Sequence, residues 1–120
     1  MDRRTFGPVP GLELLLARTD PALVSFELDA YWAYKAGQDP VRLFERLPGR
    51  FSRCHLKNGT AAPARTMVDV GAGVIGFRRL FELSSAAGLR YAFVEHDTPV
   101  DAPASVRASR DHLARLLGAA

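Results

Sequence analysis

Three side chains of types that bind divalent cations, Asp29, His55 and Glu95, each stand near the end of a short, largely apolar segment. Two carboxylates and one imidazole form a mixed donor set that suits Mn²⁺, Mg²⁺, Co²⁺ or Zn²⁺. A cation held there can polarise a carbonyl and stabilise an enediolate, while a carboxylate moves the proton. No fixed spacing enforces such a set, so the fold must bring the three segment ends together.

The three segments are predicted strands, because each is short, apolar and bounded by turn signals. Side chains alternate along a strand, so each predicted strand has an apolar face for packing on helices and a second face that becomes polar toward its end. Charges at the carboxyl ends of parallel strands are typical of a barrel active site. The predicted strands are residues 23–29, 51–57 and 91–97.

The stretches between the predicted strands carry helical patterns. Leu12, Leu15 and Leu16 recur at helical spacing. Asp39-Pro40 suits the start of another helix, since Asp can cap free amides and Pro fits the first helical position. Two further apolar faces mark the remaining helices: Phe77, Leu80, Phe81 and Ser84, closed by Gly88, and Val106, Leu113, Leu116 and Leu117, which follow Pro103.

The order of these elements predicts a parallel sheet with right-handed crossovers. The chain has 120 residues, whereas a TIM barrel needs about 250. We therefore predict an α/β fold that is a partial TIM barrel, with three consecutive βα units of parallel strands preceded by one helix. Residues 1–120 are expected to form a single domain with an irregular start at 1–10 and a long polar loop at 58–73.

Composition argues against several classes of protein. The chain is 48% hydrophobic and 24% charged, which is ordinary for a soluble domain, and no apolar run approaches the ~18 residues of a membrane span. The net charge is +3, but the basic residues are scattered, so no nucleic-acid footprint is visible. The single cysteine, Cys54, suits a reducing compartment, and we expect a cytoplasmic protein in which Cys54 is a buried small hydrophobe rather than a nucleophile.

Five short motifs follow one another along the chain: 27–32 (ELDAYW), 37–40 (GQDP), 55–58 (HLKN), 70–73 (VGAG) and 94–97 (VEHD). Together they resemble the C-terminal part of the sugar phosphate isomerase/epimerase family, and the similarity runs from about Leu12 to Leu117 in the family's order. The resemblance implies the family's xylose isomerase-like TIM barrel, of which this chain would form the last three βα units and the preceding helix.

By this resemblance, Asp29, His55 and Glu95 match three metal-ligand positions. The family's fourth ligand is a Glu on an earlier strand, which this chain does not have. In epimerases of the family, that Glu and the one matched by Glu95 form the acid/base pair, so Glu95 is the predicted catalytic residue. The implied cofactor is a divalent metal, bound weakly or incompletely by this chain alone, and the implied substrate is a sugar or sugar phosphate.

Three more residues are candidates for the site. Trp32 stands where several epimerases of the family have His, and it can line the apolar face of a sugar. Lys57 can neutralise an oxyanion or a substrate phosphate, although a surface lysine is an equal alternative. Asp97 is a candidate for orienting His55 or Lys57.

Three interpretations of function remain open. The first is a metal-dependent sugar isomerase or epimerase completed by other subunits. The second is a truncated, catalytically silent barrel remnant that acts as an interaction or sugar-binding module. Both predict self-association or a complementing barrel chain, because an open parallel sheet has unpaired edges. The third, a barrel endonuclease acting on abasic DNA, fits poorly with three histidines and scattered basic charge.

Overall fold

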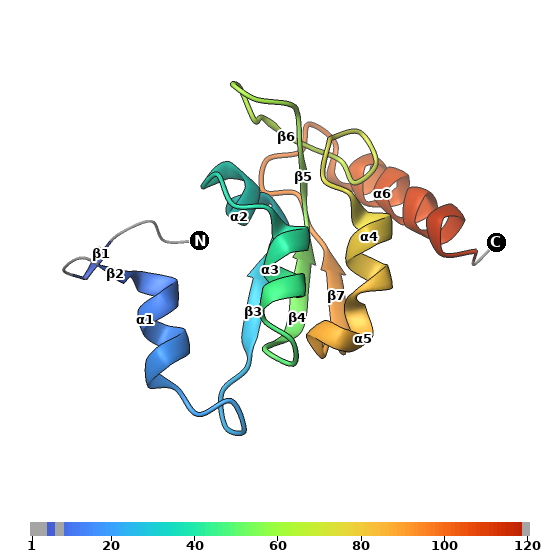
Figure 1. Ribbon diagram of the computed structural model, residues 1–120. Coiled ribbons are helices and arrows are strands. Elements are labelled where there is room, and N and C mark those ends of the chain that lie inside the picture. Colours follow the sequence, from blue (N-terminus) through green and yellow to red (C-terminus); the bar gives the residue numbers. More distant parts are fainter. Residues whose placement is uncertain (1–4, 7–8, 119–120) are drawn as a thin grey trace.

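The computed structural model describes residues 5–6 and 9–118 and centres on a three-stranded parallel sheet (Figure 1). The strands, in sheet order, are β3 (Phe26–Asp29), β4 (Phe51–Leu56) and β7 (Tyr91–Val94). Each strand leads into helical structure, and the sheet is open, with β3 and β7 at its edges. The predicted α/β fold of three consecutive parallel βα units is confirmed.

Six helices and two small antiparallel pairs complete the described part of the chain. The helices are α1 (Gly11–Arg18), α2 (Ala30–Lys35), α3 (Pro40–Arg46), α4 (Phe77–Glu82), α5 (Ser84–Ala87) and α6 (Ala102–Leu117). The pairs are β1 (Thr5–Phe6) with β2 (Val9–Pro10), and β5 (Asn58–Gly59) with β6 (Met67–Val68). The rest of the start predicted to be irregular, residues 1–4 and 7–8, lies outside the described residues. Over the described ranges, no helix has the length and apolar character needed to cross a membrane.

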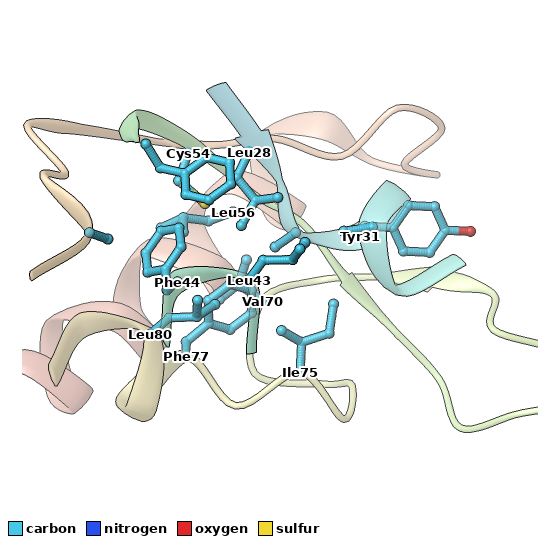
Figure 2. Packing of buried hydrophobic residues seen from close by; sticks show 14 of the residues in the cluster. Leu28, Tyr31, Leu43, Phe44, Cys54, Leu56, Val70, Ile75, Phe77 and Leu80 are labelled. Carbon is cyan, nitrogen blue, oxygen red and sulfur yellow. The ribbon is translucent and has the colours of Figure 1, made fainter. Parts of the chain in front are cut away.

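One face of the sheet is closed by a hydrophobic core (Figure 2). Leu28, Cys54 and Leu56 alternate with the polar residues of the other face, as the strand period of two requires. Buried Phe51 departs from this alternation, next to a register shift between Phe26 and Glu27. Phe44 of α3 stacks on Phe51 of β4 with 5.5 Å between ring centroids. Its buried residues from strands and helices include Leu28, Phe51, Cys54, Leu56, Tyr31, Leu43, Phe44, Phe77 and Leu80. The opposite face is left free to carry polar groups.

Helix α3 begins as its sequence predicts. The side chain of Asp39 accepts a hydrogen bond from the amide of Val41 at 2.9 Å, and Pro40 occupies the first helical turn. An Asp cap of this kind satisfies one of the free amides at a helix start. The predicted start of this helix is confirmed.

The first predicted strand is wrong at its beginning, because residues 20–24 form a turn. The amides of Leu23 and Val24 both donate to the carbonyl oxygen of Asp20, at 3.1 and 2.9 Å. These amides are therefore not available to a sheet, and pairing starts only at Phe26.

The segment predicted as a polar loop at 58–73 contains the short β5–β6 pair and is anchored by a buried amide side chain. Asn58 Oδ1 accepts hydrogen bonds from the amides of Gly59 and Ile75, both at 2.9 Å. A Cβ at Gly73 would lie 2.4 Å from this same oxygen, so only glycine fits there. Gly73 thus lets the backbone pass close to the Asn58 side chain.

Helix α6 buries only part of the apolar face that its sequence predicts: Leu113 is buried and Leu116 packs against the core. Val106 and Leu117 are about half exposed, whereas Ser105 and Ser109 are buried together with Leu113. Ser109 Oγ accepts a hydrogen bond from the amide of Val70 at 3.1 Å, and Ser105 Oγ donates to Asp69. Polar partners in the loop before α4 therefore select the serine face of the helix.

Candidate metal site

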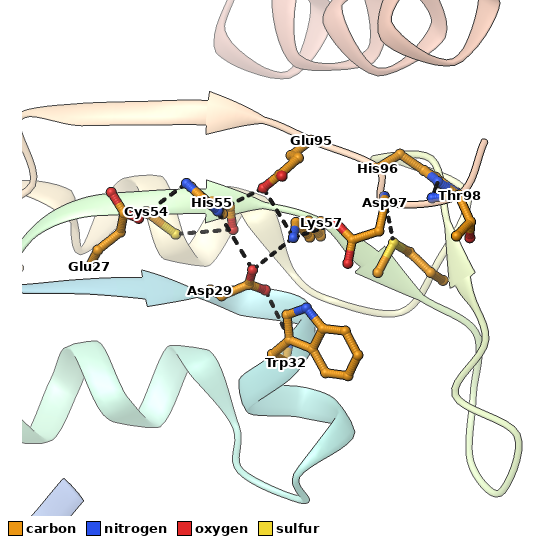
Figure 3. A network of polar contacts seen from close by, with 11 residues as sticks. Glu27, Asp29, Trp32, Cys54, His55, Lys57, Glu95, His96, Asp97 and Thr98 are labelled. Carbon is orange, nitrogen blue, oxygen red and sulfur yellow. Dashed lines mark hydrogen bonds and ion pairs between the residues drawn. The ribbon is translucent and has the colours of Figure 1, made fainter. Parts of the chain in front are cut away.

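The candidate site is built where β3, β4 and β7 end, on the face of the sheet opposite the core (Figure 3). Asp29 is the last residue of β3 and also the N-cap of α2, because its Oδ1 accepts a hydrogen bond from the amide of Trp32 at 2.9 Å. The cap fixes the carboxylate, so that its other oxygen, Oδ2, lies near His55 and Lys57. The helix start thus orients one predicted ligand.

His55 lies opposite Asp29 in the sheet register and presents one ring nitrogen to each side of the site. Its Nδ1 is 2.7 Å from Glu95 Oε2 and 3.7 Å from Asp29 Oδ2, and its Nε2 is 3.1 Å from Glu27 Oε1. Glu95 follows β7 directly, and its amide donates to the carbonyl oxygen of Leu56 at 3.3 Å. The sheet therefore positions both residues through backbone contacts.

The three predicted ligands converge. One donor atom from each of Asp29, His55 and Glu95 lies within 4.8 Å of the other two. Two carboxylate oxygens and one imidazole nitrogen match the donor preferences of Mn²⁺, Co²⁺ or Zn²⁺. The cluster can hold a divalent metal ion.

Lys57 is buried within the same cluster, with only 4% of its surface exposed. Its Nζ lies 2.6 Å from Asp97 Oδ1, 3.0 Å from Glu95 Oε2 and 3.1 Å from Asp29 Oδ2. Burial by itself would lower the pKa of Lys57, but the hydrogen bonds to these carboxylates outweigh it, so the pKa lies above its usual value. The ammonium stays charged and balances the carboxylates of the site.

The remaining predicted site residues surround this cluster. Trp32 lies in the first turn of α2, is 43% exposed, and meets the ring of Tyr31 edge-on at 5.2 Å between centroids. Asp97 contacts Lys57, and its backbone amide donates to Met67 Sδ at 3.2 Å. Trp32 thus offers an apolar surface beside the site, and Asp97 holds the lysine.

Cys54 points to the other face of β4, into the core. Burial, with a smaller effect from the charges of Asp29 and Glu27, raises the pKa of its thiol to about 12. A thiol with so high a pKa carries almost no thiolate at neutral pH and is a poor nucleophile. The side chain is a small buried hydrophobe.

One residue of the cluster, Glu27, is absent from the set of predicted site residues. It lies two positions before Asp29 on the same strand face and contacts His55. The strand period of two predicts that Glu27 lies on the polar face. It was not predicted as a site residue because it stands two positions before the end of the strand. The signal was therefore present in the sequence, as a second carboxylate at the spacing i, i+2.

Comparison with solved structures relates the chain to two proteins from Parabacteroides distasonis ATCC 8503, each described as a sugar phosphate isomerase/epimerase. One is 30% identical with a TM-score of 0.69, and the match covers 85% of this chain and 35% of that protein. The other is 27% identical with a TM-score of 0.68, and the match covers 94% of this chain and 39% of that protein. No known family model matches the chain, and neither does any curated protein.

A third solved structure extends the likeness of the fold. It is a xylose isomerase domain protein from Alicyclobacillus acidocaldarius, with 23% identity and a TM-score of 0.59, and the match covers 79% of this chain and 37% of that protein. The chain thus spans between a third and two fifths of the length of the structures it matches. It has the structure of three consecutive βα units of a TIM-barrel isomerase and resembles the sugar phosphate isomerase/epimerase proteins over that part.

Proposed function

We propose that this chain supplies three metal ligands and a catalytic carboxylate to a divalent-metal-dependent sugar or sugar phosphate isomerase/epimerase. The observation that carries the proposal is the convergence of Asp29, His55 and Glu95 at the carboxyl ends of three adjacent parallel strands. Active sites of barrel enzymes lie at this end of the strands. The similarity to two sugar phosphate isomerase/epimerase structures supports the same reaction class.

In this proposal Glu95 moves the proton. Its carboxylate is 44% exposed, so a substrate on the open face of the sheet can reach it. A carboxylate beside a carbonyl-bearing carbon can act as general base and return the proton as general acid. A divalent cation bound to the three ligands would polarise the substrate carbonyl.

The surrounding residues would bind and orient the sugar. The half-exposed indole of Trp32 offers a flat apolar surface of the kind that packs on a sugar ring. The ammonium of Lys57 can stabilise an oxyanion or a substrate phosphate, and Asp97 holds that ammonium at 2.6 Å. A cytoplasmic location and a complete active site formed with further barrel strands, from a complementing chain or from self-association, belong to the same proposal.

Exchange of substrate protons with solvent tests this function directly. The chain would be incubated in D₂O with Mn²⁺ and a panel of ketoses and ketose phosphates, and deuterium at the carbon next to the carbonyl would be measured. We expect incorporation that is lost in Glu95→Gln and retained in Glu82→Gln, a control on the surface of α4. Incorporation that is unchanged in Glu95→Gln would refute the role of this carboxylate.

A second candidate function is a catalytically silent barrel remnant that acts as an interaction or sugar-binding module. The buried Lys57 favours it, because its ammonium occupies the carboxylates of Asp29 and Glu95 that a metal ion would need. Sugar binding without deuterium incorporation in the same experiment would select this function.

A further inference from the structure

We infer that Glu27 is a positioning residue, which holds the imidazole of His55 so that Nδ1 faces the metal ion. This inference rests on the proposed metal-dependent function. Glu27 Oε1 lies 3.1 Å from His55 Nε2, whereas Asp29 Oδ2 and Glu95 Oε2 lie on the Nδ1 side of the ring (Figure 3). The two sides of the imidazole therefore meet different partners.

The chemistry of the ring explains why this arrangement matters. A neutral imidazole has one nitrogen that donates and one that accepts, and only the accepting nitrogen can bind a metal ion. If the proton is on Nε2, where the Glu27 carboxylate accepts it, the lone pair of Nδ1 points to Asp29 and Glu95. Carboxylates that accept the second ring proton of a metal-binding histidine fix its tautomer and orientation.

Rigid elements hold the ring from both sides. Glu27 is on β3 and shares the polar face with Asp29; in the register Asp29 lies across from His55 and Glu27 across from Arg53, so Glu27 reaches the ring diagonally. On the other side, Phe93 of β7 meets the imidazole edge-on, with 88° between the ring planes and 6.0 Å between centroids. Groups carried by strands hold a side chain more firmly than groups carried by loops.

The carboxylate of Glu27 has no other ion-pair partner in the described part of the chain. Its side chain is 42% exposed, and within residues 5–6 and 9–118 the ion pairs of its carboxylate involve His55 alone. It is also on the wrong side of the ring to join the donor atoms of Asp29 and Glu95. Neither core packing nor direct metal ligation accounts for a carboxylate at this place.

The test compares Glu27→Ala and Glu27→Gln with the wild type. Zn²⁺ affinity would be measured by competition with a chelator, and the Nε2–H signal of His55 would be followed by ¹H–¹⁵N spectroscopy of the Zn²⁺-loaded chain. Glu27→Ala should weaken Zn²⁺ binding about 10–100-fold and lose the slowly exchanging Nε2–H signal. Glu27→Gln should keep the signal and most of the affinity, because the amide oxygen still accepts the proton.

The outcomes separate this inference from the proposed function. Glu45→Ala, which removes an exposed carboxylate paired with Arg79, is the control and should bind Zn²⁺ as the wild type does. Wild-type binding with unchanged affinity and signal in Glu27→Ala would overturn the positioning role alone. Equal loss in Glu27→Gln and Glu27→Ala would overturn it in favour of direct ligation, and a wild type that binds no Zn²⁺ would overturn the metal-dependent function as well.

Discussion

Replacing Lys57 by Met should make the metal-free chain less stable and its metal site tighter. The ammonium contacts Asp97, Glu95 and Asp29 at 2.6, 3.0 and 3.1 Å. Without it, the three carboxylates repel one another. They also stay partly buried with no positive charge to compensate for their lost hydration. A cation that enters the cluster then meets the same carboxylates without a competing positive charge.

The loss of stability follows from burial. Breaking a buried ion pair costs about 3–5 kcal/mol, because the remaining charge stays in a poorly solvated place. The Lys57 side chain is 5% exposed, but the side chains of Asp29, Glu95 and Asp97 are 22%, 44% and 31% exposed, so water can replace part of the lost interaction. We therefore expect a loss of about 2 kcal/mol in the free energy of unfolding.

The gain in metal affinity follows from Coulomb repulsion. A monovalent and a divalent cation about 5 Å apart repel each other by about 1.7 kcal/mol even in bulk water. Removing this repulsion should tighten Mn²⁺ or Zn²⁺ binding by about tenfold or more. The two effects have opposite signs, so a general loss of structure cannot imitate them.

Urea unfolding without metal and calorimetric titration with Zn²⁺ would measure the two effects. Arg42→Met is a matched control, because Arg42 is an exposed cation that pairs only loosely with Asp39, at 4.0 Å. It should change stability by less than about 0.5 kcal/mol and leave Zn²⁺ affinity unaltered. A Lys57→Met variant that is as stable as the wild type and binds Zn²⁺ no more tightly would refute the buried ammonium cluster.

Three more predictions concern the site and the core. Asp29→Asn should keep the cap on α2 and change the free energy of unfolding by less than about 1 kcal/mol, but it should weaken Zn²⁺ binding. Asp29→Ala should weaken Zn²⁺ binding too and should also lower the free energy of unfolding in urea by about 1 kcal/mol, because the cap is lost. From pH 9 to pH 10 the wild type should lose about 1 kcal/mol of stability relative to Cys54→Ala. The thiol of the unfolded chain has its usual pKa of 9.0 and releases its proton in this range, whereas burial raises the pKa of the folded thiol to about 12. Parallel pH curves for the two proteins would contradict this sign. Phe44→Ala should cost about 3–5 kcal/mol in urea unfolding, since the ring is 1% exposed and stacked on Phe51; a loss below about 1 kcal/mol would contradict the packing of this core.

Much of the fold was predictable because its signals are local. Turn residues flank each strand, and the period of two assigns Asp29, His55 and Glu95 to one polar face. The start of α3 was predictable for the same reason, since Asp39-Pro40 specifies a cap and a first turn within two residues.

Other features depend on contacts between distant segments and were not predictable in this way. Helix α2 follows β3 without a break, so no turn signal separates them, and Asp29 acts both as cap and as candidate ligand. Ser105 and Ser109 of α6 face the molecule only because Asp69 and Val70 offer hydrogen-bond partners there. The pattern of apolar residues in a helix cannot predict hydrogen-bond partners that come from a distant segment.

The burial of Lys57 within the site could not be predicted from the sequence either. Its position after β4 predicts a residue near the active end of the strands, but its burial among three carboxylates depends on how β3 and β7 flank β4. The structure thereby makes the lysine an internal counter-charge, which both proposed functions must accommodate. In the proposed enzyme Lys57 must share the carboxylates with a metal ion. In the silent module Lys57 takes the place of the metal ion.

Native mass spectrometry with added Mn²⁺ would report metal loading and assembly of the chain in one measurement. We expect one Mn²⁺ per chain in a species larger than a monomer, with loading lost in His55→Ala. Loading should be kept in His112→Ala, because the imidazole of His112 packs on Gly71 away from the site. A wild-type chain that remains a metal-free monomer at saturating Mn²⁺ would contradict this expectation, and so would undiminished loading in His55→Ala.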